Sequence, residues 1–510
     1  MSYRALHNRL NRRFTAKSPT GSRRFPVEDS LSYEDAKPQE GSNHWSSTEY
    51  NRNNGRNVNF GSGNANNNNK YNGYVGRAVA VFGDYSVPLP FILSVWEAYH
   101  DCLKGKMGSV QAVEYMSIAA YDIPALAYEL WSGTYHPGVS TCFLVTYPKL
   151  REVFAACFRD RIVHHWVCLR LEPLFEQRFE DQGNVSFNCR KGFGTEKAVT
   201  HLAEEMRRVS NNYHNDAVVF RGDIVSFFMS IDKDLLWYLL ERFMLRWQKR
   251  MARLGDTQTI DGWYGISWSV LCRLEMERVP NMYWDILMRT TKIIVMHHPD
   301  KNCILNSPIE WWRSLDASKS LFTSPTGEPI GNLTTQQFAN FLMSFFVAYV
   351  QYLYRRKNYG MAQFVDDFAL TCDDLRYVVR TIPLLEIFLR NKLHLMMHKN
   401  KRYLQPVAHG VLFVGTFIKP GRLYLSNRTI ARITEKCNGY AVMLANEEHL
   451  SIIDLEHIEQ VLNSYLGFCR HRATYRFRQH FIAMIGNKFW KFYYVKGHYD
   501  SVKLKLKYTI

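Results

Sequence analysis

The chain has 510 residues, and 46% of them are hydrophobic, enough to bury cores in roughly two to four structural units. Its formal net charge of +17 favours a polyanionic partner, either nucleic acid or an anionic surface. No run of about 18 or more apolar residues occurs, so the sequence predicts no membrane span. The ten cysteines stand singly and form no CxxC pair or Cys/His cluster. We therefore expect reduced thiols in a cytoplasmic protein, not disulfides or a zinc site.

Residues 1–80 have a composition that cannot build a packed core by itself. Seven Lys and Arg residues precede the first acidic residue, Glu28. This Arg- and Ser-rich start resembles a transit peptide, although a basic nucleic-acid-binding arm or a solvated tail is favoured. Twelve asparagines follow between Asn43 and Asn72. We expect 1–80 to be a basic, Asn-rich and disordered segment, and its simplest interpretation is a polar linker.

Residues 81–215 are predicted to be mainly helical. Helical periodicity indicates helices at 91–103, 110–121, 124–131 and 160–179. Between them, Lys149 and Arg151 stand two residues apart in a β-prone segment and so share one face of a strand. Such a pair suits the phosphates of a triphosphate. A solvent-facing basic edge is the alternative.

Three carboxylates stand at the ends of predicted strands. An apolar, β-prone run over 217–222 ends at Asp223, and two short apolar runs flank Asp366 and Asp367. The second pattern predicts a hairpin with both aspartates at its tip. Adjacent carboxylates repel each other and are best tolerated around a hard cation such as Mg²⁺. Taken separately, the hairpin is a solvated turn and Asp223 a strand-end cap. A third carboxylate on another strand favours a site.

Between these strands lies a Gly- and Pro-rich loop over 325–337, which leads into an apolar helix over 338–354. A backbone-rich loop at a helix N-terminus suits a nucleotide or a template base. The order of strand, loop with helix, and hairpin resembles motifs A, B and C of the reverse-transcriptase palm. Ile330 replaces the usual Gln before Gly331, and Thr335-Gln336 follows. This resembles the Ile-Gly-Asn-Leu-Thr-Ser-Gln form of diversity-generating retroelement enzymes, with Thr335 in place of Ser.

The resemblance covers roughly residues 85–470 and implies an α+β right-hand polymerase. Residues 81–215 would form N-terminal helices and fingers. Residues 216–420 would form a palm with an antiparallel sheet, motifs A to D and an insertion at 242–320. Residues 421–510 would form a helical thumb. From Arg470 to Ile510 there are ten Lys or Arg residues and one acidic residue, interleaved with aromatics, which suits a template–primer duplex.

The resemblance also implies the site. Two Mg²⁺, with Mn²⁺ as the alternative ion, would be held by the metal-site residues Asp223, Ile224, Asp366 and Asp367. Lys401 matches the motif D lysine and would assist the leaving group. The nucleotide-binding residues would be Lys149, Arg151, Phe228, Ile330, Gly331 and Gln336. In this set Phe228 matches the steric gate against a ribose 2′-hydroxyl. Ile330 supplies shape without a hydrogen bond, which should lower fidelity.

The expected function is an RNA-directed DNA polymerase of bacterial or phage origin. It would copy a template-repeat RNA into adenine-mutagenised cDNA that diversifies a target protein gene. The partners implied are template RNA, the cDNA or primer, dNTPs and a small basic accessory protein, with no membrane. The segment 43–79 resembles the end of a lectin-like variable protein, so it is either a translated template repeat or a linker. Two alternatives stay open: a retron or phage-defence reverse transcriptase, and a catalytically silent RNA-binding palm protein.

Overall fold

The computed structural model describes residues 43–49, 54–59, 65–69, 87–146, 149–254, 282–324, 326–446 and 450–505. The chain divides into two compact units. Unit 1 comprises Met1–Leu174 and Lys233–Thr335, and unit 2 comprises Phe175–Asp232 and Gln336–Ile510. Each unit is thus built from two separate stretches of the sequence, and the divisions cross the predicted palm range of 216–420.

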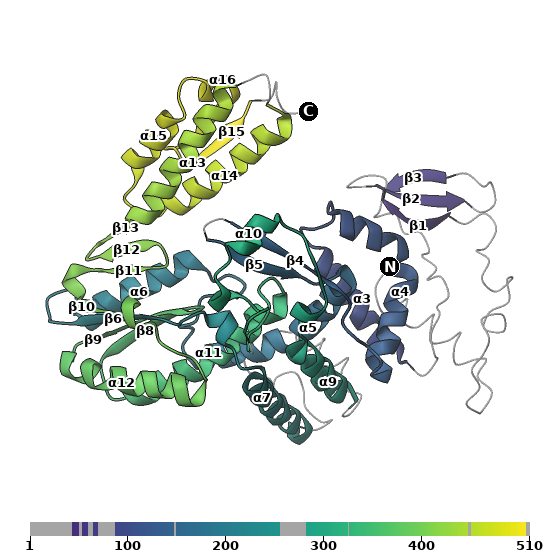
Figure 1. Ribbon diagram of the computed structural model, residues 1–510, viewed down its shortest axis with the longest axis horizontal. Coiled ribbons are helices and arrows are strands. Elements are labelled where there is room, and N and C mark those ends of the chain that lie inside the picture. The colour runs from purple at the N-terminus through teal and green to yellow at the C-terminus, as the bar shows by residue number, and fades with distance from the viewer. Residues whose placement is uncertain are drawn as a thin grey trace. The chain divides into compact units, whose positions relative to one another are not determined.

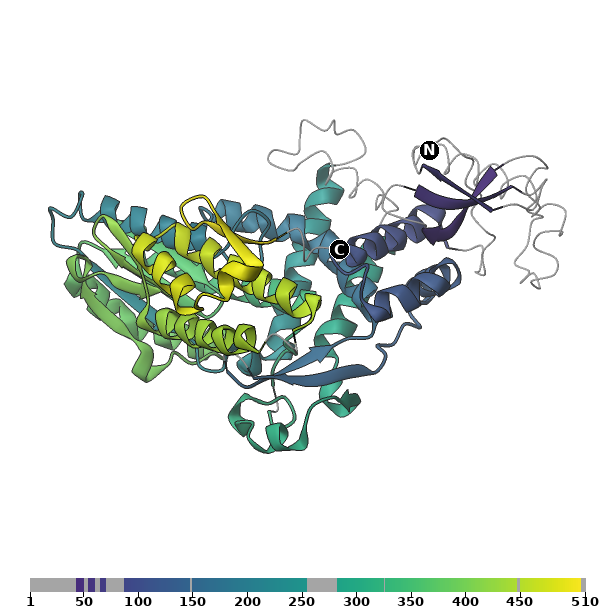
Figure 2. The ribbon, with the colours of Figure 1, turned by 90° about the horizontal axis from the view of Figure 1, so that it is seen from above.

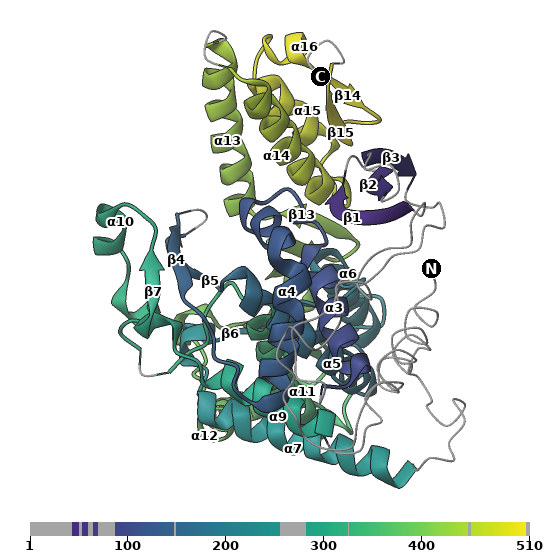
Figure 3. The same ribbon diagram turned by 90° about the vertical axis from the view of Figure 1, so that its right-hand side faces the viewer.

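Unit 1 is mainly helical. Its helices are α3 (Leu89–Leu103), α4 (Val110–Ser132), the first part of α5 (Phe158–Asp181), α7 (Lys233–Leu254), α9 (Met282–Met296) and the short α10 (Ile309–Arg313). Figure 3 shows α3, α4 and α5 side by side, with α7 packed along α9. Trp166 of α5 is fully buried, and its ring lies against Phe91 of α3 at a centroid distance of 5.6 Å. Aromatic packing therefore holds this helical layer together.

Two helices predicted separately at 110–121 and 124–131 form the single helix α4. Pro124 lies inside this helix and is buried. A proline removes one backbone hydrogen-bond donor and so weakens the interior of a helix. Burial of Ile123, Leu126 and Ala127 around it keeps the helix continuous.

Unit 1 also contains two small sheets. One has the order β5-β4-β7, where β4 (Ser140–Val145) pairs antiparallel with β5 (Arg151–Ala155) and parallel with β7 (Cys303–Leu305). The other is antiparallel and consists of β1 (Asn43–Glu49), β2 (Asn54–Asn59) and β3 (Ala65–Asn69). These strands stand where the sequence predicted no regular structure. The basic start at 1–42 and the centre of the predicted insertion, 255–281, lie outside the described residues.

The centre of unit 2 is a four-stranded antiparallel sheet with the order β10-β6-β9-β8. Its strands are β6 (Val218–Asp223), β8 (Tyr359–Phe364), β9 (Asp367–Cys372) and β10 (Tyr403–Pro406). Helix α6 (Thr195–Val209) covers one face, where Ala369 is buried. Helix α11 (Leu333–Tyr354) covers the other face, where the Phe346 ring meets Phe368 at 4.8 Å. Figure 1 shows the sheet with α6 on one side and α12 (Leu375–Lys392), which packs on α11, on the other.

The remainder of unit 2 follows this sheet in sequence. A small antiparallel sheet contains β11 (Val411–Phe413), β12 (Thr416–Lys419) and β13 (Arg422–Leu425). The C-terminal elements are α13 (Asn427–Ala445), α14 (Ile452–Arg470), α15 (Tyr475–Met484), α16 (Phe489–Phe492) and the hairpin of β14 (Tyr493–Lys496) and β15 (Ser501–Leu504). They share one apolar core, and Figure 2 shows the hairpin beside the helices. The helical spacing of Leu455, Ile458 and Leu462 is therefore explained by burial.

The fold is thus a mixture of helices and sheets, in which all the strand pairs described are antiparallel except that of β4 with β7. Among the residues described, no helix is long and apolar enough to cross a membrane.

Candidate active site

The hairpin predicted around Asp366 and Asp367 is present. Strand β8 ends at Phe364 and β9 begins at Asp367, so Val365 and Asp366 form a two-residue turn. Val365 has a φ of 56°, which is strained for a β-branched residue. The Gln363 side chain donates a hydrogen bond of 2.7 Å to the Val365 carbonyl and supports this conformation. Strain of this kind clusters at functional sites, where the surrounding structure maintains it.

Strand β6 brings the third carboxylate beside this hairpin. Asp223 is the last residue of β6 and lies opposite Asp367 in the antiparallel register. The preceding residue must be glycine, because a Cβ on Gly222 would lie only 2.4 Å from the Phe368 ring. The backbone amide of Ile224 donates to the Asp366 carbonyl at 3.2 Å. The ends of two neighbouring strands therefore place Asp223, Asp366 and Asp367 together.

The carboxylates at this end of the sheet repel one another and are electrostatically unfavourable by themselves. Burial, followed by the negative charges of Asp367 and Asp223, raises the pKa of Asp366 to about 6. Burial also raises the pKa of Asp367, opposed chiefly by Arg221. Asp223 is 6% exposed, and its Oδ1 has no hydrogen-bond partner among the described residues. The site thus concentrates negative charge that a cation would stabilise.

Two basic side chains offset part of this charge. Lys401, in the short helical turn Lys399–Lys401, forms an ion pair with Asp223 through its Nζ and the Oδ2 of the carboxylate. Arg221 pairs with Asp367 at 2.8 Å between Nη2 and Oδ1, and its side chain is 13% exposed. The sequence prediction included Lys401 but missed Arg221. Its position two residues before Asp223 on one strand, and so on the same face, was the available signal.

The donor set fits a hard divalent cation. Mg²⁺ prefers carboxylate oxygens, and here three carboxylates converge, with one buried oxygen left unpartnered. At present Lys401 and Arg221 engage two of these carboxylates. With the side chains in these positions, no group of three or more His, Cys, Asp or Glu residues in the described part of the chain could hold a metal ion. Binding of a cation would therefore compete with at least one of these ion pairs.

The Gly- and Pro-rich loop with Ile330 and Gly331 belongs to unit 1, where it is fixed against β5. The Phe154 amide donates to the Ile330 carbonyl at 2.7 Å. Gly331 has a φ of 128°, and a Cβ there would lie 2.4 Å from the Phe154 carbonyl oxygen. The buried Glu152 of β5 accepts a hydrogen bond of 2.8 Å from the Ser320 hydroxyl. Loop and strand thus have little freedom to separate.

A buried acid and a buried base also belong to this loop region. Glu328 is 2% exposed, and burial raises its pKa to about 8, while the positive charge of Lys233 opposes the rise. Burial lowers the pKa of Lys233, whose Nζ donates to the His297 carbonyl. His164 of α5 bonds Thr334 at 2.7 Å, just beyond the loop. The sequence did not predict a role for Glu328 or Lys233, although Glu328 stands in the Gly- and Pro-rich loop, because their burial depends on tertiary packing.

The other predicted residues are distributed over both units. Lys149 and Arg151 are exposed in unit 1, with Arg151 at the start of β5. Phe228 is half-buried in the 3₁₀ turn Phe227–Ser230 of unit 2, where its ring lies 5.4 Å from Phe227. Gln336 is exposed in α11, and its Oε1 accepts a hydrogen bond of 3.1 Å from the Cys189 thiol. Of the predicted site residues that the structure describes, the three aspartates, Ile224 and Lys401 lie in contact at one place. The roles of all the predicted residues stay predictions.

No protein-family model matches this sequence, and no curated protein matches it either. Solved telomerase structures overlap the fold at low similarity. Telomerase from Candida albicans, in complex with a TWJ fragment of telomeric RNA, is 12% identical with a TM-score of 0.38, over 70% of this chain and 56% of that chain. Apo telomerase from Candida tropicalis is 12% identical with a TM-score of 0.37, over 70% of this chain and 62% of that chain.

The chain thus spans less than two thirds of either telomerase chain. Overlap at such scores carries no argument about activity.

Proposed function

We propose that this chain is an RNA-directed DNA polymerase similar to those of diversity-generating retroelements. One observation carries the proposal: Asp223 lies in register with Asp367 at one end of the antiparallel sheet, directly beside the strained turn at Asp366. Three carboxylates from two strands are the donor set that nucleotidyl transfer with two metal ions requires. A plain solvated hairpin would explain neither the partly buried carboxylates of the hairpin nor the strain at Val365.

In the proposed reaction, Asp223, Asp366 and Asp367 hold two Mg²⁺, or Mn²⁺ as the alternative. Ions held there would supply a lower pKa for the primer 3′-hydroxyl and positive charge to neutralise the triphosphate. Arg221 orients Asp367 through its ion pair. The Lys401 ammonium, released from Asp223, donates its proton to the leaving pyrophosphate. Lys149 and Arg151 bind the phosphates of the incoming nucleotide.

The proposed mutagenic character depends on Ile330 and its loop. An aliphatic side chain contributes shape but no hydrogen bond to the nascent base pair, so mismatched pairs are rejected less strongly. Gln336 and the backbone at Gly331 complete the nucleotide-binding loop, and Phe228 excludes the ribose 2′-hydroxyl. The product is cDNA with errors at template adenines, made from a template-repeat RNA with a small basic accessory protein as partner.

The test is cDNA synthesis by the purified full-length chain. The reaction contains the RNA encoded beside its gene, the accessory protein, dNTPs and Mg²⁺, and its products are sequenced deeply. Asp366→Asn removes one proposed ligand with little change in volume. Asp373→Asn is the matched control, because Asp373 is an exposed carboxylate just beyond the far end of β9. We expect cDNA with errors at adenines from the wild type and the control, and none from Asp366→Asn.

Other outcomes select the alternatives. Accurate cDNA would keep the polymerase and refute the mutagenic role, in favour of a retron or phage-defence enzyme. Product from Asp366→Asn at the wild-type rate would refute the assignment of the site. If neither the wild type nor either variant makes cDNA, but the wild type binds the RNA, the chain is a catalytically silent RNA-binding protein.

A further inference from the structure

A second candidate site lies in unit 2 on the face of the sheet that α6 covers. It is an open pocket of about 340 Å³ between α6 and the segment before it. The pocket is lined by Gly183, Asn184, Phe187, Phe193, Glu196, Lys197, Thr200, His201 and Glu204. Its volume is at the small end of the range of about 300–1,000 Å³ for ligand pockets. None of these residues takes part in the proposed polymerase reaction.

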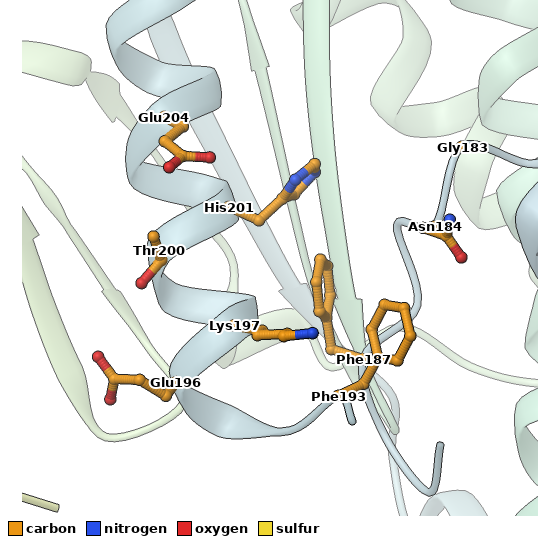
Figure 4. Close-up of a pocket in the computed structure, with 9 residues that line it drawn as sticks. All are labelled: Gly183, Asn184, Phe187, Phe193, Glu196, Lys197, Thr200, His201 and Glu204. Atoms are coloured by element: carbon orange, nitrogen blue, oxygen red, sulfur yellow. The ribbon is translucent and has the colours of Figure 1, made fainter. Parts of the chain in front are cut away.

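Aromatic rings form the walls of this pocket. Phe187 lies 5.0 Å from the His201 ring and 5.9 Å from the Phe193 ring, measured between centroids. Figure 4 shows Lys197 and His201 extending from one face of α6 toward the two phenylalanines. The Lys197 Nζ lies 4.9 Å from the centre of the Phe193 ring. The pocket therefore combines flat apolar surfaces with one exposed cation, Lys197.

The walls are held in place by groups behind them. Arg190 is 6% exposed, and its guanidinium stacks on Phe193 at 3.8 Å. The same guanidinium is bound by Glu176 at 2.7 Å and by the Ser186 carbonyl. His201 Nε2 lies 3.0 Å from the Met361 carbonyl of β8 and donates its proton to that carbonyl, which fixes the orientation of the ring. A preorganised pocket of this kind loses little entropy on binding.

The charge around the pocket limits the ligand. Glu196 pairs with the buried Arg472 at 3.1 Å, so it does not neutralise Lys197. Glu204 at the rim is exposed and opposes a highly charged anion. A triphosphate is therefore disfavoured, whereas one phosphate with one base matches one cation and the aromatic walls. Bases of any sequence stack on aromatic side chains, typically with about 1–3 kcal/mol per base.

We propose that this pocket binds one nucleotide of a single-stranded nucleic acid, with its base on the aromatic walls and its phosphate on Lys197. The nucleic-acid segment held there would lie beside α6, on the side of the sheet that α6 covers. The nearest β-strand is β8, which leads to the turn at Asp366. The inference is independent of the polymerase reaction, because it concerns equilibrium binding and needs neither catalysis nor a metal ion.

The test measures the affinity of the full-length chain for a labelled single-stranded RNA of mixed sequence at several salt concentrations, in EDTA. Lys197→Gln removes the phosphate contact, so it should weaken binding and reduce the slope of log affinity against log salt by about 0.7. Phe193→Leu keeps an apolar side chain but removes the aromatic face, so it should weaken binding about tenfold and leave the slope unchanged. Lys392→Gln, at an exposed position at the end of α12, is the matched control for loss of a positive charge.

The pattern of these results decides the proposal. If Lys197→Gln affects affinity and slope no more than Lys392→Gln, the pocket does not contact the strand. Because Phe193 packs on Arg190, circular dichroism must show that Phe193→Leu is folded. If Phe193→Leu does not fold, the result for Lys197→Gln, at an exposed position, still decides the test. A free nucleoside triphosphate that binds with an affinity dependent on Lys197 would also overturn the proposal, in favour of a nucleotide site. A free monophosphate should compete only weakly.

Discussion

Glu328 offers the most specific test of the electrostatics of the loop that carries Ile330. Burial raises the pKa of this carboxyl to about 8 from its ordinary 4.5. In the unfolded chain Glu328 ionises above pH 4.5, whereas in the folded chain it stays protonated until about pH 8. Its contribution to stability is therefore fully present below pH 4.5 and is lost as the pH rises through 8. At about 1.4 kcal/mol per pKa unit, the loss between pH 5 and pH 8 is about 3 kcal/mol.

The substitution Glu328→Gln should remove this pH dependence, because glutamine has nearly the same shape as the protonated acid and does not ionise. We expect the variant to match the wild type at pH 5 and to exceed it by about 3 kcal/mol at pH 8. The two units need not unfold together, so a local measurement is preferable. Hydrogen exchange of the Phe154 amide, which is bonded to Ile330, reports the opening of this loop directly.

The control for this experiment is Asp316→Asn, in an exposed turn of the same unit. The Lys319 and Ser318 side chains lower the pKa of Asp316, so its stabilising effect is already complete at pH 5. The difference in stability between Asp316→Asn and the wild type should therefore be the same at pH 5 and at pH 8. A Glu328→Gln variant that is less stable than the wild type at pH 8 would refute the reasoning. That result would mean that Glu328 is ionised in the folded protein and stabilised by Lys233.

Three further predictions concern the sheet edge. Without divalent cations, Asp366→Asn should be more stable than the wild type at pH 8 but not at pH 4. The reason is the raised pKa of Asp366, because of which the wild type loses stability as the pH rises through about 6. Added Mg²⁺ should then raise the melting temperature of the wild type only. Gly222→Ala should lower the free energy of unfolding by about 1–3 kcal/mol, since the new methyl group meets the Phe368 ring, and an unchanged urea midpoint would contradict this. Phe228→Ala should increase incorporation of ribonucleotides relative to deoxynucleotides, measured by competition in one reaction, whereas an unchanged ratio would exclude Phe228 as the gate.

The hairpin and the strand that form the candidate site were predictable because local patterns specify them. The two short apolar runs that flank Asp366-Asp367 predicted the β8–β9 hairpin, and the run before Asp223 predicted β6. Strand signals of this kind depend on residues close in sequence. The sequence also predicted the helix that begins after the Gly- and Pro-rich loop, which the structure has as α11.

Errors arose where distant packing outweighs a local signal. Two helices were predicted at 110–121 and 124–131, but the apolar side chains around Pro124 are buried and α4 continues through it. The Asn-rich composition of 43–69 predicted disorder, whereas three paired strands occur there, and the pairing of backbone groups does not depend on side-chain type.

The sequence by itself determined the residue types of the candidate site and the elements on which they stand, because strand and turn preferences are local. Only the tertiary structure decided the register that sets Asp223 opposite Asp367, and the ion pairs that Arg221 and Lys401 make there. Likewise, the burial of Glu328 and the charge of Lys233 near it involve residues from distant parts of the sequence. Contacts of this kind follow from how elements pack, and a single sequence carries no local pattern for them.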